Sequence, residues 1–236
     1  MIVALLSWYE EHEGALAACV ASLGGVVDHV VAVDGAYALY PGGRAKSGAH
    51  QAEAIRETAR ALKMGCTIFE PQTVWRGNEV EKRSYMFRLA ETLTTEDDWY
   101  MVIDADELVT DWGGVNVKAR LDETDKDVAQ VTLWNRRPHL PAEGPPPFFN
   151  PLEQQEPLRM FFRAIRGLHV SGMHFHYKCP DGRFLWADGA VEIAEPEQLL
   201  DVRVEHRSLS RDPTRRQDSQ EYYNRRVKAG IEGRLG

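Results

Sequence analysis

Short apolar runs alternate with segments of helical periodicity through the first half of the chain. The apolar runs have the length of buried strands and span residues 1–6, 29–33, 66–69 and 99–103. Between them, apolar residues recur every three or four positions, as on one face of a helix, over residues 11–23, 52–62 and 80–93. Strands without polar alternation that are separated by helices predict an α/β fold, with a mostly parallel sheet covered by helices on both faces.

The second half of the chain has a less regular pattern. Strands are predicted over residues 128–134, 158–163, 169–177 and 202–206, followed by a polar helix over residues 214–228. Between the first two of these strands, residues 138–151 hold six of the twelve prolines of the chain. Because proline fixes its own φ and lacks an amide hydrogen, this segment is predicted to be an ordered loop or a lid.

Composition narrows the class of protein. Hydrophobic residues make up 43% of the 236 positions, enough for a sizeable core, and the formal net charge of −8 argues against a nucleic-acid binder. The widely spaced Cys19, Cys66 and Cys179 indicate neither a disulfide framework nor a Cys-x-x-Cys metal site, so a reducing, cytoplasmic location is expected. Residues 1–6 are too short for the apolar part of a signal peptide, and no stretch has the length of a membrane span.

Carboxylates crowd the end of the fourth apolar run, at Asp104, Asp106 and Glu107. Like charges this close resist burial, and in an extended segment the first two side chains point to the same side. Oxygen ligands of this kind suit Mn²⁺ or Mg²⁺, which would offset the repulsion and leave positions open for phosphate oxygens or water. A surface turn with scattered acids is the alternative. An EF-hand is excluded because the sixth and twelfth positions from Asp104 are both valine.

Four segments carry a resemblance to a known family. They are LLSWYEEHEGALAACVASL, HVVAVDG, WRGNEVEKRSYMFRLA and WYMVIDADELV. In this order, over roughly the first 110 residues, they resemble the GT-A glycosyltransferases, most closely family 2 and its β-glucosyltransferase-like branch. The resemblance implies a single GT-A (Rossmann-like) domain over residues 1–236. Residues 1–112 would form the nucleotide-sugar-binding half, and residues 113–236 a smaller acceptor-side half.

The resemblance also implies roles for residues of the first half. Ser7 and Glu10 would meet the nucleoside after the first strand, and Asp34 would accept a hydrogen bond from the base or the ribose. Lys82 or Arg83 would approach the phosphates. Departures from the family pattern around residues 9, 34–36 and 84 leave the specificity for base and sugar open.

A metal site follows from the same resemblance. Asp106 would ligate a divalent cation, Mn²⁺ or Mg²⁺, that bridges the diphosphate, and Asp104 would contact the ribose or the water shell of the metal. In "VRVEHRSLSRDP", His206 matches a strand-end histidine that serves as a further metal ligand, and Arg207 would touch the diphosphate. Glu107 is expected to position the loop rather than to act as a ligand.

Two further histidines are catalytic candidates. His174 and His176 lie two positions apart in "GMHFHYK", on one face of an extended segment. They are expected to line the acceptor site, one of them as a ligand or a base, although a structural histidine is the alternative for each. Trp8 and Trp186, near predicted loops, are candidates for stacking on a sugar.

The expected activity is metal-dependent transfer of a single sugar from a nucleoside diphosphate sugar, expected to be a UDP-sugar. The acceptor stays open among a protein, a glycan, a lipid-linked molecule and a modified nucleic-acid base. Inversion or retention and the oligomeric state also stay open. A nucleotidyltransferase is one alternative, but "SWYEEHEG" lacks the glycine-rich phosphate loop typical of that class. A noncatalytic nucleotide-sugar or glycan-binding protein on the same scaffold is the other.

Overall fold

The computed structural model describes residues 1–136, 153–171, 176–186, 194–207 and 213–228. The strands of the first half are β1 (Ile2–Ser7), β2 (His29–Val33), β3 (Gly65–Phe69), β4 (Trp99–Asp104) and β5 (Glu107–Asp111). Those of the second half are β6 (Val128–Arg136), β7 (Glu153–Arg163), β8 (His169–Val170), β9 (Tyr177–Lys178), β10 (Phe184–Trp186) and β11 (Glu197–His206). The helices are α1 (Glu13–Ser22), α2 (Ala49–Ala61), α3 (Asn78–Ala90), α4 (Val117–Glu123) and α5 (Pro213–Lys228).

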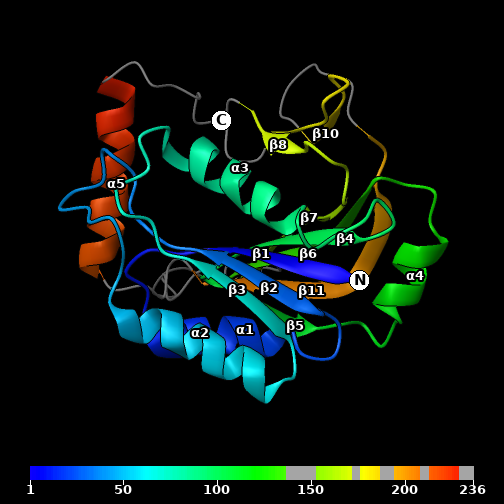
Figure 1. The fold of residues 1–236 in the computed structure, drawn as a ribbon. Helices are drawn as coiled ribbons and strands as arrows, with labels where there is room; N and C mark the ends of the chain where they lie inside the picture. The colour runs from blue at the N-terminus through cyan, green and yellow to red at the C-terminus, as the bar shows by residue number, and fades with distance from the viewer. Residues whose placement is uncertain (137–152, 172–175, 187–193, 208–212, 229–236) are drawn as a thin grey trace, which may run out of the picture.

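One large sheet has the strand order β3-β2-β1-β4-β7-β6-β11-β5. Strands β1 to β4 pair in parallel, as do β6 and β11, whereas β7 runs antiparallel to both its neighbours and β5 antiparallel to β11. Helices α1 and α2 cover one face and α3 the other, where the small sheet of β8, β9 and β10 lies beside α3 (Figure 1). The predicted class, a GT-A (Rossmann-like) mostly parallel sheet flanked by helices, is confirmed.

Strand β1 lies at the centre of the core because helices cover it on both sides. Its residues Ile2, Ala4 and Leu6 pack in the cluster that includes α1 and α2, whereas Val3 and Leu5 pack in the cluster that includes α3. Every residue of β1 is buried, which explains why its sequence is continuously apolar rather than alternating. In the described part of the chain, no helix is long and apolar enough to cross a bilayer.

Three elements were not predicted from the sequence: β5, α4 and β10. Strand β5 begins at the acidic residue Glu107 and is held by pairing with β11, a partner nearly one hundred positions later. Helix α4 has seven residues, too few to show a period, and begins where the Asn116 side chain accepts a hydrogen bond from the Ala119 amide. The proline-rich segment 138–151 lies outside the described residues, so its predicted role as a loop or lid stays a prediction.

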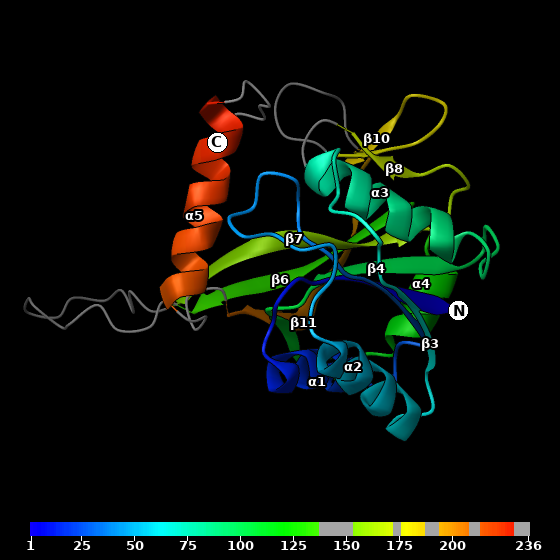
Figure 2. The same cartoon turned by 60° about the vertical axis from the view of Figure 1, so that its left-hand side comes forward.

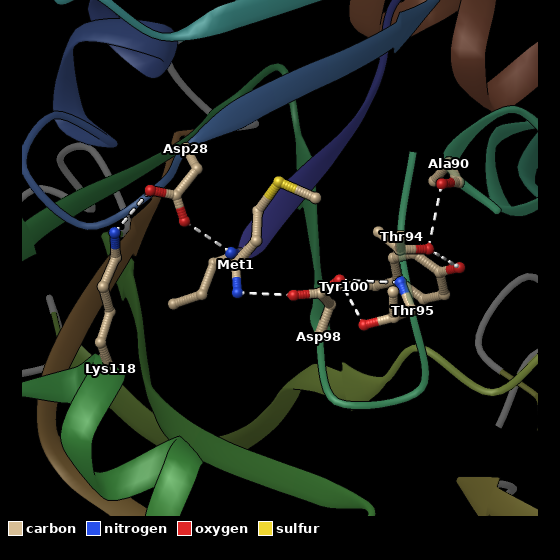
Figure 3. A network of polar contacts seen from close by, with 9 residues as sticks. Met1, Asp28, Ala90, Thr94, Thr95, Asp98, Tyr100 and Lys118 are labelled. Atoms are coloured by element: carbon tan, nitrogen blue, oxygen red, sulfur yellow. Dashed lines mark hydrogen bonds and ion pairs between the residues drawn. The ribbon is translucent and has the colours of Figure 1, made fainter. Parts of the chain in front are cut away.

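Two carboxylates hold together the amino-terminal ends of β1, β2 and β4 (Figure 3). Asp28, which precedes β2, accepts hydrogen bonds from the Ile2 amide at 2.7 Å and from Lys118 Nζ at 2.6 Å. Asp98 accepts one from the Met1 amino group at 2.6 Å and two from Thr95. Burial raises the pKa of Asp28, but the hydrogen bonds from Lys118 and Ile2 outweigh it, so the net pKa lies below the usual range.

Replacing Asp28 by asparagine is expected to lower the free energy of unfolding by about 1 kcal/mol at pH 7. Because the folded pKa of Asp28 is depressed, its contribution is present above the unfolded pKa and is lost as the pH falls through the folded pKa. Urea denaturation at pH 7 and pH 3 should therefore show a smaller difference between wild type and Asp28→Asn at the lower pH. The exposed Asp97→Asn is the control, and an equal loss in both variants at pH 7 would contradict this assignment.

Candidate functional site

The carboxyl ends of the central strands bring the acidic residues together. Ser7, the last residue of β1, is paired with Val33 of β2 and with Asp104 of β4. Strand β5 begins at Glu107, so residues 105–106 form a tight acidic turn between β4 and β5. Strand β11 ends with His206 paired to Glu107. The fold therefore assembles the metal-site residues predicted from two distant parts of the sequence.

Each carboxylate of this turn has a protein partner. The Arg83 guanidinium, from α3, donates to both carboxylate oxygens of Asp104 at 2.7 Å. His206 Nε2 lies 3.2 Å from Asp106 Oδ2. Glu107 Oε2 accepts a hydrogen bond from the Asp104 amide at 2.9 Å, a contact that joins the two ends of the turn. A cation is therefore not the sole means of balancing the acidic turn.

Burial changes the protonation of this cluster. Burial and the charges of Asp104 and Asp106 raise the pKa of Glu107 to about 8. The raised pKa favours the protonated form of Glu107, which lessens the negative charge of the turn. Burial lowers the pKa of His206. Its hydrogen bond to Asp106 and the charge of that carboxylate outweigh this effect, so the net pKa lies above the usual value.

Asp34 and Lys82 are not positioned as predicted, because both side chains are only 1% exposed and are bonded to protein groups. The Asp34 carboxylate accepts hydrogen bonds from the Gly35 amide and from the amide and hydroxyl of Ser47, each at 2.6 Å. Lys82 Nζ donates to the carbonyl oxygens of Trp8 at 2.6 Å and Gly35 at 2.9 Å. These groups clamp the loops that follow β1 and β2 instead of facing a ligand.

The clamp depends on close packing at Gly35. Its φ of +105° lies in the region that favours glycine, and a Cβ there would meet the Ala45 carbonyl oxygen at 2.5 Å. Burial of the Lys82 ammonium group lowers its pKa to about 7, although the nearby Asp34 raises it. Arg83 is likewise buried and donates to Asp104. Neither Lys82 nor Arg83 is therefore placed for the predicted contacts with phosphates.

A cavity of about 990 Å³, the edge cavity, opens beside the acidic turn. Of the predicted site residues, Glu10, Asp106 and Arg207 line it. The rest of its wall comes from residues 9–13 and one side of α1, from residues 40–42 and 44 after β2, from the beginning of α2, from residues 105 and 108 beside Asp106, and from the first turns of α5. Its volume falls at the upper end of the range usual for small-molecule sites.

Glu10 reaches the edge cavity through an unusual backbone conformation. Its φ is +48°, rare for a residue with a side chain, and its amide donates to Ser47 Oγ at 2.8 Å. Arg44, a cavity residue that sequence reasoning missed, donates to Glu10 Oε1 at 2.5 Å. Tyr9 was also missed; its hydroxyl accepts from the Arg44 amide. A polar loop after β2 was the available signal, since loops at this end of a parallel sheet carry ligand contacts.

The remaining histidine and tryptophan candidates that the structure describes do not line the edge cavity. His174 lies outside the described residues. The ring of His176 packs edge-on against Phe184, with centroids 6.4 Å apart, and does not line the cavity. Trp8 is 3% exposed and belongs to the core, so the prediction that it stacks on a sugar is wrong. Trp186 stacks on Tyr177 in the small sheet.

Asp106 Oδ2 and His206 Nε2 lie 3.2 Å apart, which is the distance of the hydrogen bond that raises the pKa of His206. It is the type of these atoms, and not the distance between them, that suits a metal site, because a carboxylate oxygen and an imidazole nitrogen are both ligands that divalent cations accept. Within the described ranges, no group of three or more His, Cys, Asp and Glu side chains is arranged to hold a metal ion. A cation bound by this pair would thus depend on a ligand or on water for its remaining positions.

Comparison with known proteins gives distant structural similarity and no sequence match. No protein-family model matches the chain, and no curated protein matches it. It is similar to a structure of S. aureus TarS, with 14% identity over 69% of this chain and 28% of TarS and a TM-score of 0.38. The complex of TarS 1–349 with UDP-GlcNAc gives 18% identity over 62% of this chain and 37% of that one, with the same TM-score.

The chain spans less than half the length of these TarS structures. Because a TM-score of 0.38 does not establish a common fold, the fold class follows from the strand order and the helix packing described above.

Replacing Arg83 by methionine is expected to lower the free energy of unfolding by about 2 kcal/mol, because Asp104 loses its bidentate partner beside two other carboxylates. Chemical denaturation of Arg83→Met, Asp104→Asn and the double variant measures this coupling. The double variant should lose less than the sum of the single losses. The exposed Arg88→Met, also on α3, is the control; strictly additive losses would contradict the pairing.

Proposed function

We propose that this chain is a metal-dependent glycosyltransferase that transfers a single sugar from a UDP-sugar to an acceptor. The observation that carries the proposal is Asp106 at the wall of a cavity of about 990 Å³, with His206 Nε2 at 3.2 Å from its Oδ2. That cavity lies at the carboxyl ends of the strands, where α/β sheets bind their ligands. The resemblance of the first 110 or so residues to GT-A enzymes supports the same reading.

Asp106 and His206 are the residues that would hold Mn²⁺ or Mg²⁺. When bound, the cation supplies stabilisation of the negative charge that grows on the diphosphate leaving group. Arg207 contributes positive charge at the same wall, with a side chain that is 43% exposed. Its amide donates to the Asp106 carbonyl oxygen at 2.7 Å, which fixes the two ends of the metal site together.

Opposite the acidic turn, the cavity wall offers groups suited to a nucleoside. Tyr9 and Tyr40 present aromatic rings that suit stacking with a base or a sugar, and their centroids lie 5.4 Å apart in an edge-on arrangement. Arg44 adds an exposed guanidinium for phosphate or carboxylate groups. Asp34 and Lys82 fix the loops that carry this wall, whereas Ser7 is 8% exposed at the end of β1 and does not line the cavity.

Replacing Asp106 by asparagine is expected to lower the release of UDP from the donor at least about 100-fold, because charge stabilisation of the leaving group is worth several kcal/mol. The assay measures UDP released from UDP-sugars in the presence of Mn²⁺. Asp111→Asn, an exposed carboxylate of the neighbouring β5, should leave the rate unchanged. Full activity in Asp106→Asn would contradict the metal assignment.

The same assay separates the rival functions. A wild-type protein whose melting temperature rises with UDP and Mn²⁺ but which releases no UDP from any donor would be a noncatalytic binder. Release of pyrophosphate from a nucleoside triphosphate would instead support a nucleotidyltransferase. The acceptor is then sought among proteins, glycans, lipid-linked molecules and modified nucleic-acid bases by transfer of labelled sugar.

A further inference from the structure

Helix α5 packs along the loop that follows β2, an arrangement that both views of the fold show (Figures 1 and 2). The contact is made by Tyr222, which is 2% exposed although α5 is mostly polar. Its ring stacks on Tyr37 with a centroid distance of 5.1 Å and an interplanar angle of 29°. It also lies 6.0 Å from the ring of Tyr40, at an angle of 38°.

This aromatic contact continues to the edge cavity. Tyr40 lies edge-on against Tyr9, and both rings line the cavity. Thr214 and Asp218, from the first turns of α5, line it as well. Helix α5 thus belongs to the cavity wall directly, and through Tyr222 it supports the part of the wall that the loop after β2 provides.

The loop is anchored at its two ends and also between them. Asp34 binds Gly35 and Ser47, and the Ala36 amide donates to the Arg44 carbonyl oxygen. The Ala38 amide donates to the Trp75 carbonyl oxygen at 3.0 Å, and the Trp75 amide donates to the Ala36 carbonyl oxygen at 2.9 Å. Tyr222 adds ring contacts with Tyr37 and Tyr40 to these backbone hydrogen bonds, the second of them beyond residue 38 at the tip of the loop.

We propose that Tyr222 is a positioning residue for donor binding: its stacking on Tyr37 and Tyr40 holds α5 and residues 36–44 as one wall of the edge cavity. Docking of α5 and binding of the nucleoside diphosphate are then linked equilibria, each of which favours the other by the same factor. This inference rests on the proposed function, because the ligand in question is the nucleoside diphosphate part of the donor.

The test compares Tyr222→Ala with Tyr222→Phe by calorimetric titration of UDP in the presence of Mn²⁺. Loss of two aromatic contacts is expected to raise the Kd of Tyr222→Ala about tenfold. The phenyl ring of Tyr222→Phe keeps both contacts and should restore the Kd to within about twofold of wild type. Asn224→Ala, on the exposed side of α5, is the matched control and should bind as wild type does.

A second measurement needs no variant. Trypsin cleavage after the exposed Arg225 reports undocking of α5, and saturating UDP with Mn²⁺ should slow it about tenfold in the wild type by reciprocity. Equal cleavage rates with and without UDP would overturn the inference, as would an unchanged Kd in a folded Tyr222→Ala. Wild-type protein that binds no nucleotide would refute the proposed function and this inference together, whereas wild-type binding with an insensitive Tyr222→Ala would refute the inference alone.

Discussion

The crowding of three carboxylates between β4 and β5 is the constraint on which the candidate site depends. Arg83 holds Asp104, His206 lies against Asp106, and Glu107 bonds to the Asp104 amide. Removal of Arg83 would leave the Asp104 carboxylate beside two other acidic groups without its cationic partner. Arg83 comes from α3, Glu107 from β5 and His206 from β11, so the form of the turn depends on elements that are distant in the sequence.

Two buried charged residues hold the loops that border the edge cavity. Asp34 and Lys82 do not line the cavity, and they fix the loops after β1 and β2 by hydrogen bonds with the Ser47 amide and with the Trp8 and Gly35 carbonyl oxygens. These loops carry Tyr9 and Arg44 into the wall. Two residues that the family resemblance assigns to the nucleotide are thus structural supports in this chain.

Periodicity and order in the sequence were enough to predict the α/β class and the central strands, because fully buried parallel strands must be continuously apolar. The family resemblance selected Asp106 and His206, and the structure brings the two together because Asp106 follows the end of β4 and His206 ends β11. The sequence pattern could not predict that the Asp34 carboxylate binds the Ser47 amide, because this contact depends on how the loop folds between two residues thirteen positions apart. It also missed β5, whose strand form comes from pairing with β11 and not from its own pattern.

The central claim is that Asp106 and His206 bind a cation that joins the protein to a nucleoside diphosphate. The most direct measurement is a crystal structure with UDP and Mn²⁺, with anomalous scattering recorded to locate manganese. We expect a manganese peak within ligand distance of Asp106 Oδ2 and His206 Nε2, with the diphosphate in the edge cavity. UDP bound elsewhere, or bound in the cavity with no manganese at this pair, would contradict it.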